Sequence, residues 1–236
     1  MLASLRRLIF PTWCELCHGA TTRGICATCQ DQALQVLEPP FCLRCSERLE
    51  GVGENVPRCA HCRDQDFAFE SVITAYELNE SLRTLVHSFK YKRSLYLTDL
   101  LGELLSQVLS DQRISGLVPE EWVITDVPLH HSRERWRYFN QARLLSQALS
   151  HRTTIPYEPL LQRTIRTPHQ ARLGKRERAR NVRGAFTPLY PHVELPSRNI
   201  ILVDDVFTTG ATVNACAQQL RKAGAQRILV VCLARK

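Results

Sequence analysis

The sequence predicts an α/β protein in which a parallel-sheet domain follows a small cysteine-rich segment. An unbroken apolar run at 200–203 is typical of a strand covered on both faces of a parallel sheet, and a loop, a helix pattern and another apolar run follow it. Eight of the ten cysteines lie within the first 62 residues. A length of 236 residues suits one core-bearing domain and a smaller one, which we place at 66–236 and 1–65.

The cysteines of the first segment form four CxxC pairs, and two thiolates separated by two residues fit one side of a tetrahedral metal site. The pairs are Cys14/Cys17, Cys26/Cys29, Cys42/Cys45 and Cys59/Cys62. Eight ligands predict two zinc ions in a double zinc ribbon. Short spacings favour joining the first pair to the second and the third to the fourth. A cross-braced arrangement, and a redox or disulfide role for the pairs, are the alternatives.

Apolar patterns place the middle elements in chain order. Strands are predicted at 72–78 and 122–127, and helices at 80–91, 96–109 and about 140–151. Residues 130–137 are rich in arginine and are expected to form a basic loop. Residues 186–199 hold three prolines and are expected to be a surface connection.

Two adjacent carboxylates, Asp204 and Asp205, stand at the carboxyl end of the predicted strand, where α/β sheets bind ligands. They suit hydrogen bonds from vicinal ribose hydroxyls, or Mg²⁺ held through water. A hydroxyl-rich loop then precedes a helix, and such a loop favours an anion. The loop residues are Thr208, Thr209, Gly210, Ala211 and Thr212. The alternative to a ligand site is an ordinary strand, turn and helix in which the two acids are solvated.

The helix after this loop shows an apolar face from Val213 to Leu220 and a C-terminal stop at Gly224, and a last strand is predicted at 227–233. The whole unit resembles the phosphoribosyl pyrophosphate (PRPP) signature of type I phosphoribosyltransferases. That resemblance implies that Asp204 and Asp205 bind the ribose and that the loop holds the 5′-phosphate, with Mg²⁺ accompanying PRPP.

The formal charge of +8 lies entirely in residues 66–236, which hold 24 Lys and Arg against 16 Asp and Glu. One basic cluster, 133–143, interleaves arginines with Trp136, Tyr138 and Phe139; another, 163–183, holds eight basic residues and one acid. Cations with interleaved aromatics suit single-stranded nucleic acid. A solvated face, or arginines that hold only PRPP and pyrophosphate, would explain the clusters equally well.

No apolar run reaches the roughly 20 residues of a membrane helix, and Pro11 interrupts the only N-terminal apolar stretch. We therefore expect a cytoplasmic protein without membrane insertion. Cys216 and Cys232 fall on a helix face and within a strand, so we expect them to be small buried apolar residues.

These segments together resemble the ComF/GntX family, a competence-associated group in which a zinc ribbon precedes a type I phosphoribosyltransferase-like domain. The resemblance rests on the CxxC pairs, the PRPP loop and three further stretches at 82–94, 127–142 and 167–186. In that family one loop usually reads Arg-Gly-Phe-Asn-Gln, whereas this chain has Tyr138 where glycine is usual. Glycine at such a position supplies a positive φ or a close backbone approach.

The resemblance implies a cytoplasmic protein that handles single-stranded DNA during transformation or use of DNA as a nutrient, with PRPP binding retained. It also implies protein partners in DNA uptake or recombination. The basic cluster at 163–183 corresponds in position to the loop that closes over the site in type I transferases. The candidates for pyrophosphate or nucleic-acid contact are Arg133, Arg137, Gln170, Arg176, Arg178, Asn181 and Arg183.

Two functions from different classes stay open at the level of sequence. One is a DNA-handling factor that binds PRPP as a ligand, which would then alter DNA affinity by ordering the 163–183 segment. The other is an active phosphoribosyltransferase that moves ribose 5-phosphate from PRPP to a base or amine and releases pyrophosphate. The residues identify the PRPP half of a site, but they identify no acceptor pocket and no general base. This absence favours the DNA-handling factor.

Overall fold

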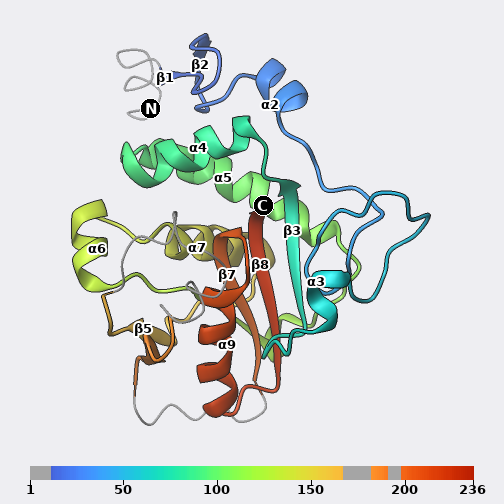
Figure 1. The fold of residues 1–236 in the computed structure, drawn as a ribbon. Coiled ribbons are helices and arrows are strands. Elements are labelled where there is room, and N and C mark those ends of the chain that lie inside the picture. The colour runs from blue at the N-terminus through green and yellow to red at the C-terminus, as the bar shows by residue number, and fades with distance from the viewer. Residues whose placement is uncertain (1–11, 167–181, 191–197) are drawn as a thin grey trace.

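A four-stranded parallel sheet forms the centre of the protein, in the strand order β3-β8-β7-β4 (Figure 1). The computed structural model describes residues 12–166, 182–190 and 198–236. The strands are β3 (Ser71–Glu77), β4 (Trp122–Asp126), β7 (Asn199–Phe207) and β8 (Arg227–Arg235). Their continuous apolar runs are buried because helices or loops cover both faces.

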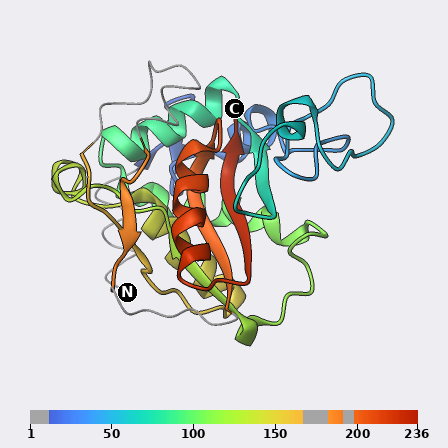
Figure 2. The same cartoon turned by 60° about the horizontal axis from the view of Figure 1, so that its bottom comes forward.

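Successive residues of each strand point to opposite faces, so each strand contributes to two cores. Ile201 and Val203 face one core together with the helices α4 (Glu80–Tyr91), α5 (Thr98–Leu105) and α7 (Gln141–Thr153). Ile200 and Leu202 face the other core, which is covered by α9 (Ala211–Lys222) and by an antiparallel hairpin of β5 (Leu161–Arg163) and β6 (Phe186–Pro188). The result is a three-layered domain (Figures 1 and 2).

Most predicted elements are present, and three predicted segments differ from the structure. The predicted basic loop at 130–137 is mainly a short helix, α6 (His131–Arg137), and the predicted connection at 186–199 begins with the strand β6. The predicted helix at 96–109 is α5 flanked by two short 3₁₀ segments, Leu95–Leu97 and Ser106–Ser110. A further 3₁₀ turn, Pro119–Glu121, leads into β4.

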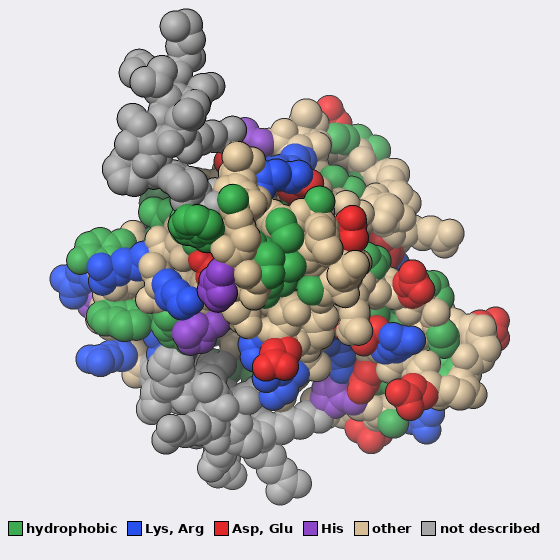
Figure 3. Space-filling model, turned by 90° about the horizontal axis from the view of Figure 1, so that it is seen from above, with side chains coloured by type: hydrophobic (Ala, Val, Ile, Leu, Met, Phe, Trp, Pro, Cys, Tyr) green, Lys and Arg blue, Asp and Glu red, His purple; other side chains and the backbone are tan. Residues whose placement is uncertain are grey.

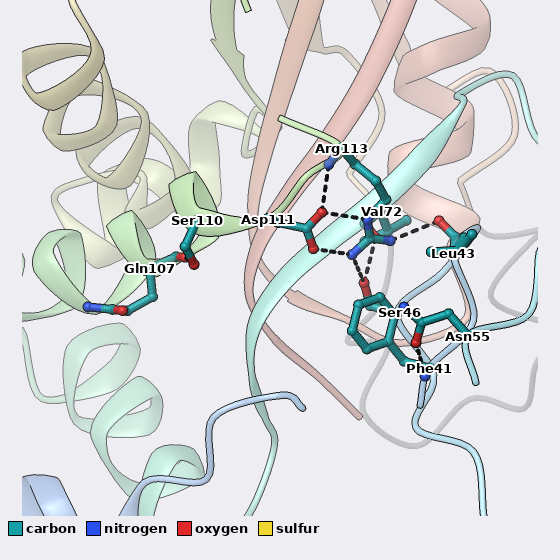
Figure 4. A network of polar contacts seen from close by, with 9 residues as sticks. All are labelled: Phe41, Leu43, Ser46, Asn55, Val72, Gln107, Ser110, Asp111 and Arg113. Carbon is teal, nitrogen blue, oxygen red and sulfur yellow. Dashed lines mark hydrogen bonds and ion pairs between the residues drawn. The ribbon is translucent and has the colours of Figure 1, made fainter. Parts of the chain in front are cut away.

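The cysteine-rich segment wraps one edge of the sheet and contributes β1 (Thr12–Trp13), β2 (Ala20–Thr21), α2 (Ala27–Ala33) and α3 (Ala60–Arg63). Arg113 fastens it to the sheet, because its guanidinium donates to the carbonyls of Leu43 and Val72 and to the hydroxyl of Ser46 at 2.8, 3.1 and 3.1 Å (Figure 4). Asp111 pairs with the same guanidinium at 2.6 Å and fixes its orientation. In the part of the chain that the structure describes, no helix has the length and apolar character needed to cross a membrane.

Candidate sugar-phosphate site and cysteine clusters

Asp204 and Asp205 lie near the carboxyl end of β7, with Asp204 partly buried and Asp205 buried. Their place follows from the parallel sheet, whose carboxyl ends all meet at one edge. α4 passes over this edge (Figure 1) and brings Lys90 to within 2.7 Å of both carboxylate oxygens of Asp205. The ammonium compensates a carboxylate that would be costly to bury alone.

Asp204 carries an unusual protonation equilibrium. Burial, and next the neighbouring Asp205 carboxylate, raise the pKa of Asp204 from 3.8 to about 7, against the opposing influence of Lys90. The backbone N–H of Asp205 donates to Asp204 Oδ1 at 2.8 Å, which holds the acid in one rotamer. The first acid of the pair is therefore poised to change its charge near neutral pH.

Residues 208–210 link β7 to α9, and the last two residues of the predicted loop, Ala211 and Thr212, form the start of the helix. Gly210 stands at the start of α9 with φ of 79°, in the left-handed region that glycine adopts without strain. A Cβ at Gly210 would lie 3.1 Å from atoms of Phe207 and Phe67, so glycine is also needed for packing. The backbone thus turns tightly here and presents the amino end of a three-turn helix.

A cavity of about 440 Å³ opens over the two acids and this loop. Thr208, Gly210, Ala211 and Thr212 line one side of it, and Thr209 is not among the lining residues. Six cationic side chains also line it: Arg83 and Lys90 of α4, Arg133 and Arg137 of α6, Arg163 of β5, and Lys236 after β8. Carboxylates and cations therefore face one space from different elements.

Arg137 is buried, although it lines the cavity. Its guanidinium lies 4.8 Å from the centre of the Tyr91 ring, and Nη1 donates to Gln141 Oε1 at 3.0 Å. Its buried Nε has no hydrogen-bond partner among the described residues. A buried guanidinium with donor capacity to spare is suited to a multiply charged anion in the cavity.

The loop that follows α6 holds Arg137 in place. Tyr138 adopts a φ of 71° and ends α6, so the positive φ that glycine would supply is present and tyrosine adopts it. Asn140 caps α7 and donates to Asp126 Oδ2 at 2.6 Å and to the Val127 carbonyl at 3.1 Å. Gln141 thus holds Arg137 directly, whereas Asn140 fixes the start of α7 against the end of β4.

The other predicted contacts are divided between two groups. Gln170, Arg176, Arg178 and Asn181 lie outside the described residues. Arg183 is described, lies in an exposed turn and does not line the cavity. Arg143, from the first basic cluster, pairs with Glu134 at 2.6 Å.

The eight paired cysteines form two clusters, in which the four sulfur atoms lie within 4.8 Å of one another. Cys14, Cys17, Cys26 and Cys29 form one cluster, and Cys42, Cys45, Cys59 and Cys62 form the other. The sequential pairing is thus confirmed over the cross-braced one. Hydrogen bonding between two sulfurs of the second cluster lowers the pKa of Cys42 and raises the pKa of Cys45. Four converging sulfurs fit tetrahedral zinc, which would be held by these residues.

The second cluster is joined to the cavity edge through one salt bridge. Glu47 Oε2 accepts from the Cys59 thiol at 3.0 Å and lies 2.9 Å from Arg235 at the end of β8. Arg235 also donates to the Cys45 carbonyl at 3.2 Å, and its guanidinium lies 5.4 Å from the centre of the Phe207 ring. Phe207 in turn packs under Gly210 of the loop.

Comparison with known proteins decides the family. The chain is 32% identical over 226 residues to Competence protein F of Haemophilus influenzae, a match that covers 94% of this chain and 96% of that protein. It is 33% identical over 236 residues to DNA utilization protein YhgH of Escherichia coli strain K12, with 97% and 99% covered. This chain belongs to the ComF family.

Among solved structures, this ComF-family protein is similar to purine phosphoribosyltransferase from Pyrococcus horikoshii, with a TM-score of 0.33 and 18% identity over 58% of this chain and 72% of that one. No protein-family model matches the chain.

Sequence reasoning missed one wall of the cavity in this ComF-family protein. α4 supplies Val86, His87, Lys90 and Tyr91 to the lining, although the stretch containing them carried no assigned role. Lys90 and Asp205 are 115 positions apart in the chain, so only the tertiary fold reveals their ion pair. The one available signal was a lysine and a histidine on the helix near its apolar stripe.

Proposed function

We propose that this protein binds PRPP together with Mg²⁺ in the cavity at the carboxyl edge of the sheet, and that it handles single-stranded DNA in the cytoplasm. The names of its relatives, a competence protein and a DNA utilization protein, support the DNA-related part of this proposal. The cavity supports the ligand part, because PRPP carries both a sugar diol and two separate anionic groups.

The juxtaposition in the cavity of a carboxylate pair, a loop before a helix, and a cationic wall carries the proposal. The loop 208–212 would hold the 5′-phosphate by backbone amides and hydroxyls. Asp204 and Asp205 would accept hydrogen bonds from the ribose hydroxyls. Arg133 and Arg137 would contact the pyrophosphate, whose charge Mg²⁺ neutralises when it is bound. Gln170, Arg176, Arg178, Asn181 and Arg183 stay candidates for pyrophosphate or DNA contact.

An active phosphoribosyltransferase is the second candidate, and the wall formed by α4 favours it. Val86, His87 and Tyr91 face the cavity beside Lys90 and offer apolar and aromatic surface to a flat acceptor. In such a reaction a nitrogen lone pair of the acceptor forms a bond to the anomeric carbon. The bond from that carbon to pyrophosphate breaks, and the acceptor nitrogen loses its proton.

Calorimetry with partial ligands tests the binding proposal. PRPP, ribose 5-phosphate and pyrophosphate, each with Mg²⁺, are titrated into wild type, D204N/D205N and Arg137→Ala, with Asp31→Asn as an exposed control. D204N/D205N is expected to lose affinity for ribose 5-phosphate, and Arg137→Ala is expected to lose affinity for pyrophosphate. Equal affinities of all variants for PRPP would reject this site.

Pyrophosphate release from PRPP, measured over a panel of bases and amines with and without single-stranded DNA, separates the two candidates. Release that depends on an acceptor and disappears in D204N/D205N would make the protein an enzyme. Tight PRPP binding without release would support the DNA-handling function with PRPP as a ligand.

A further inference from the structure

The last turn of α6 and the residue after it carry two exposed aromatic rings whose exposure the fold does not explain. Trp136 is 59% exposed and Tyr138 is 71% exposed. The residues that alternate with them point inward, since Arg137 is buried at the cavity and Phe139 packs against Phe89 with ring centroids 5.3 Å apart. The turn therefore has an inner side that builds the sugar-phosphate site and an outer side that presents two large rings to solvent.

The conformation of Tyr138 adds to this observation. A bulky residue with a φ of 71° is strained relative to glycine. Burial of the ring does not offset that strain, because the ring is mostly in water and its described ring partner is an exposed cation, Arg93, 4.0 Å from the ring centre. A side chain that is strained and unburied is a candidate for a function outside the fold.

Two exposed arginines accompany these rings. Arg93 reaches Tyr138 and also donates to the Trp136 carbonyl at 3.3 Å, while Arg135 on α6 is exposed. The acid of α6, Glu134, is neutralised by Arg143 at 2.6 Å. Figure 3 shows basic, histidine and apolar side chains gathered over the α6 side of this face, whereas most acidic ones lie toward the opposite side.

This surface is continuous with the cavity through a series of rings. The ring of Trp136 meets Tyr91 edge to face with centroids 6.3 Å apart, and Tyr91 lies 4.7 Å from His87. Tyr91 and His87 line the cavity, and Arg137 lies over the inner side of Tyr91. A polymer lying on the outer rings would therefore extend toward the sugar-phosphate site.

We propose that Arg93, Arg135, Trp136 and Tyr138, here called the aromatic–basic surface, bind single-stranded nucleic acid by stacking bases on the two rings and holding phosphates with the two arginines. The proposal rests on the proposed function, to which it adds the contact surface. Flat exposed rings with interleaved cations match the faces of unpaired bases and the charge of the backbone. A paired duplex would hide its base faces from these rings.

Binding of a labelled oligo(dT) of about 12 nucleotides to the full-length protein tests the surface at several salt concentrations. Trp136→Ala and Tyr138→Gly are each expected to weaken binding by about 5- to 100-fold while leaving the salt slope unchanged. Trp136→Phe keeps a ring and should retain most of the affinity. Arg135→Ala should reduce the salt slope by about one.

Controls keep the test specific. Tyr190 carries another ring that is 59% exposed, and it follows β6 at the end of the hairpin that lies away from Arg163. Tyr190→Ala should therefore bind oligo(dT) like wild type. Trp136→Phe keeps a ring against Tyr91, and neither ring lines the cavity, so PRPP calorimetry of this variant should match wild type.

Each outcome separates the surface from the wider proposal. If the ring variants bind oligo(dT) as tightly as wild type, the proposed role of the aromatic–basic surface is overturned, whereas the proposed DNA handling is not. A wild type that fails to bind oligo(dT), while binding PRPP, would overturn the DNA part of the proposed function together with the surface. Equal affinity for duplex and single strand would reject base stacking.

Discussion

Lys90 on α4 and Asp205 on β7 form an ion pair across the top of the sheet, with Nζ 2.7 Å from both carboxylate oxygens. The pair joins the helix that roofs the cavity to the strand that supplies its acids. It also places a cation beside a carboxylate pair that would otherwise repel itself. The ion pair thereby couples α4, which covers the cavity, to β7, which supplies the two carboxylates.

Lys90→Met should lower the free energy of unfolding by about 2 kcal/mol, because it leaves the buried Asp205 carboxylate without its partner. Urea denaturation at pH 8 measures this value. Lys92→Met is the matched control, since Lys92 is exposed and lies 3.7 Å from Glu15. The double variant K90M/D205N should recover part of the loss, and equal stabilities of the two single lysine variants would contradict the coupling.

PRPP affinity should fall as the pH is lowered through 7. A pKa of about 7 for Asp204 means that this acid is mostly protonated at pH 6 and then accepts hydrogen bonds from ribose hydroxyls less well. If only the ionised form binds, affinity at pH 6 should be about tenfold below that at pH 8. Calorimetry at both pH values measures the ratio. Asp204→Asn, which does not titrate, should show a smaller ratio.

The same shift predicts a stability trend. An acid whose pKa is higher in the folded state than in the unfolded one holds its proton longer when folded, so wild type should lose stability relative to Asp204→Asn as pH rises from about 4 to 7. Above that range the difference should be constant. A difference that is independent of pH across the window would contradict the raised pKa.

Tyr138→Gly should stabilise the protein, by about 1 kcal/mol, because glycine adopts the observed φ of 71° without strain and the exposed ring contributes little burial. Thermal unfolding measures the shift, and Tyr138→Ala, which keeps a Cβ at that φ, should show no such gain. A destabilised glycine variant would indicate that the contact between Tyr138 and Arg93 outweighs the backbone strain.

Zinc content should fall from two ions to one when a cysteine of either cluster is replaced. Cys45→Ser removes a buried ligand and Cys17→Ser an exposed one, so we expect the larger loss of thermal stability in Cys45→Ser. Native mass spectrometry counts the ions. Cys232→Ser, which is buried and outside both clusters, should keep two. A wild type without bound metal would contradict the assignment.

The sequence predicts those parts of the fold whose signal is local. The helix at 80–91 is confirmed to the residue, because apolar periodicity and the cap at Asn79 coincide. The CxxC spacing predicts two four-cysteine clusters and favours the pairing that the structure shows, and the structure decides against the cross-braced alternative. The carboxylates of β7 and the loop after it are placed by the rule that parallel strands present their carboxyl ends at one edge.

What the sequence could not predict depends on distant contacts or weak patterns. α6 spans seven residues, HSRERWR, with little apolar periodicity, and its ends are set by the cap at His130 and the positive φ of Tyr138. β5 and β6 are three residues each and become strands only by pairing with each other. The role of α4 as a wall appears only where the chain brings Lys90 to Asp205.

A path of contacts from Cys45 through Arg235 and Phe207 to Gly210 joins the second cysteine cluster to the loop before α9. Cys59 donates to Glu47 only as a thiol, so a metal held by the Cys59 thiolate would remove that hydrogen bond and leave the Glu47 carboxylate to Arg235 alone. Metal occupancy of the second cluster would then be felt, through Arg235 and the Phe207 ring, at a loop that contains none of the paired cysteines.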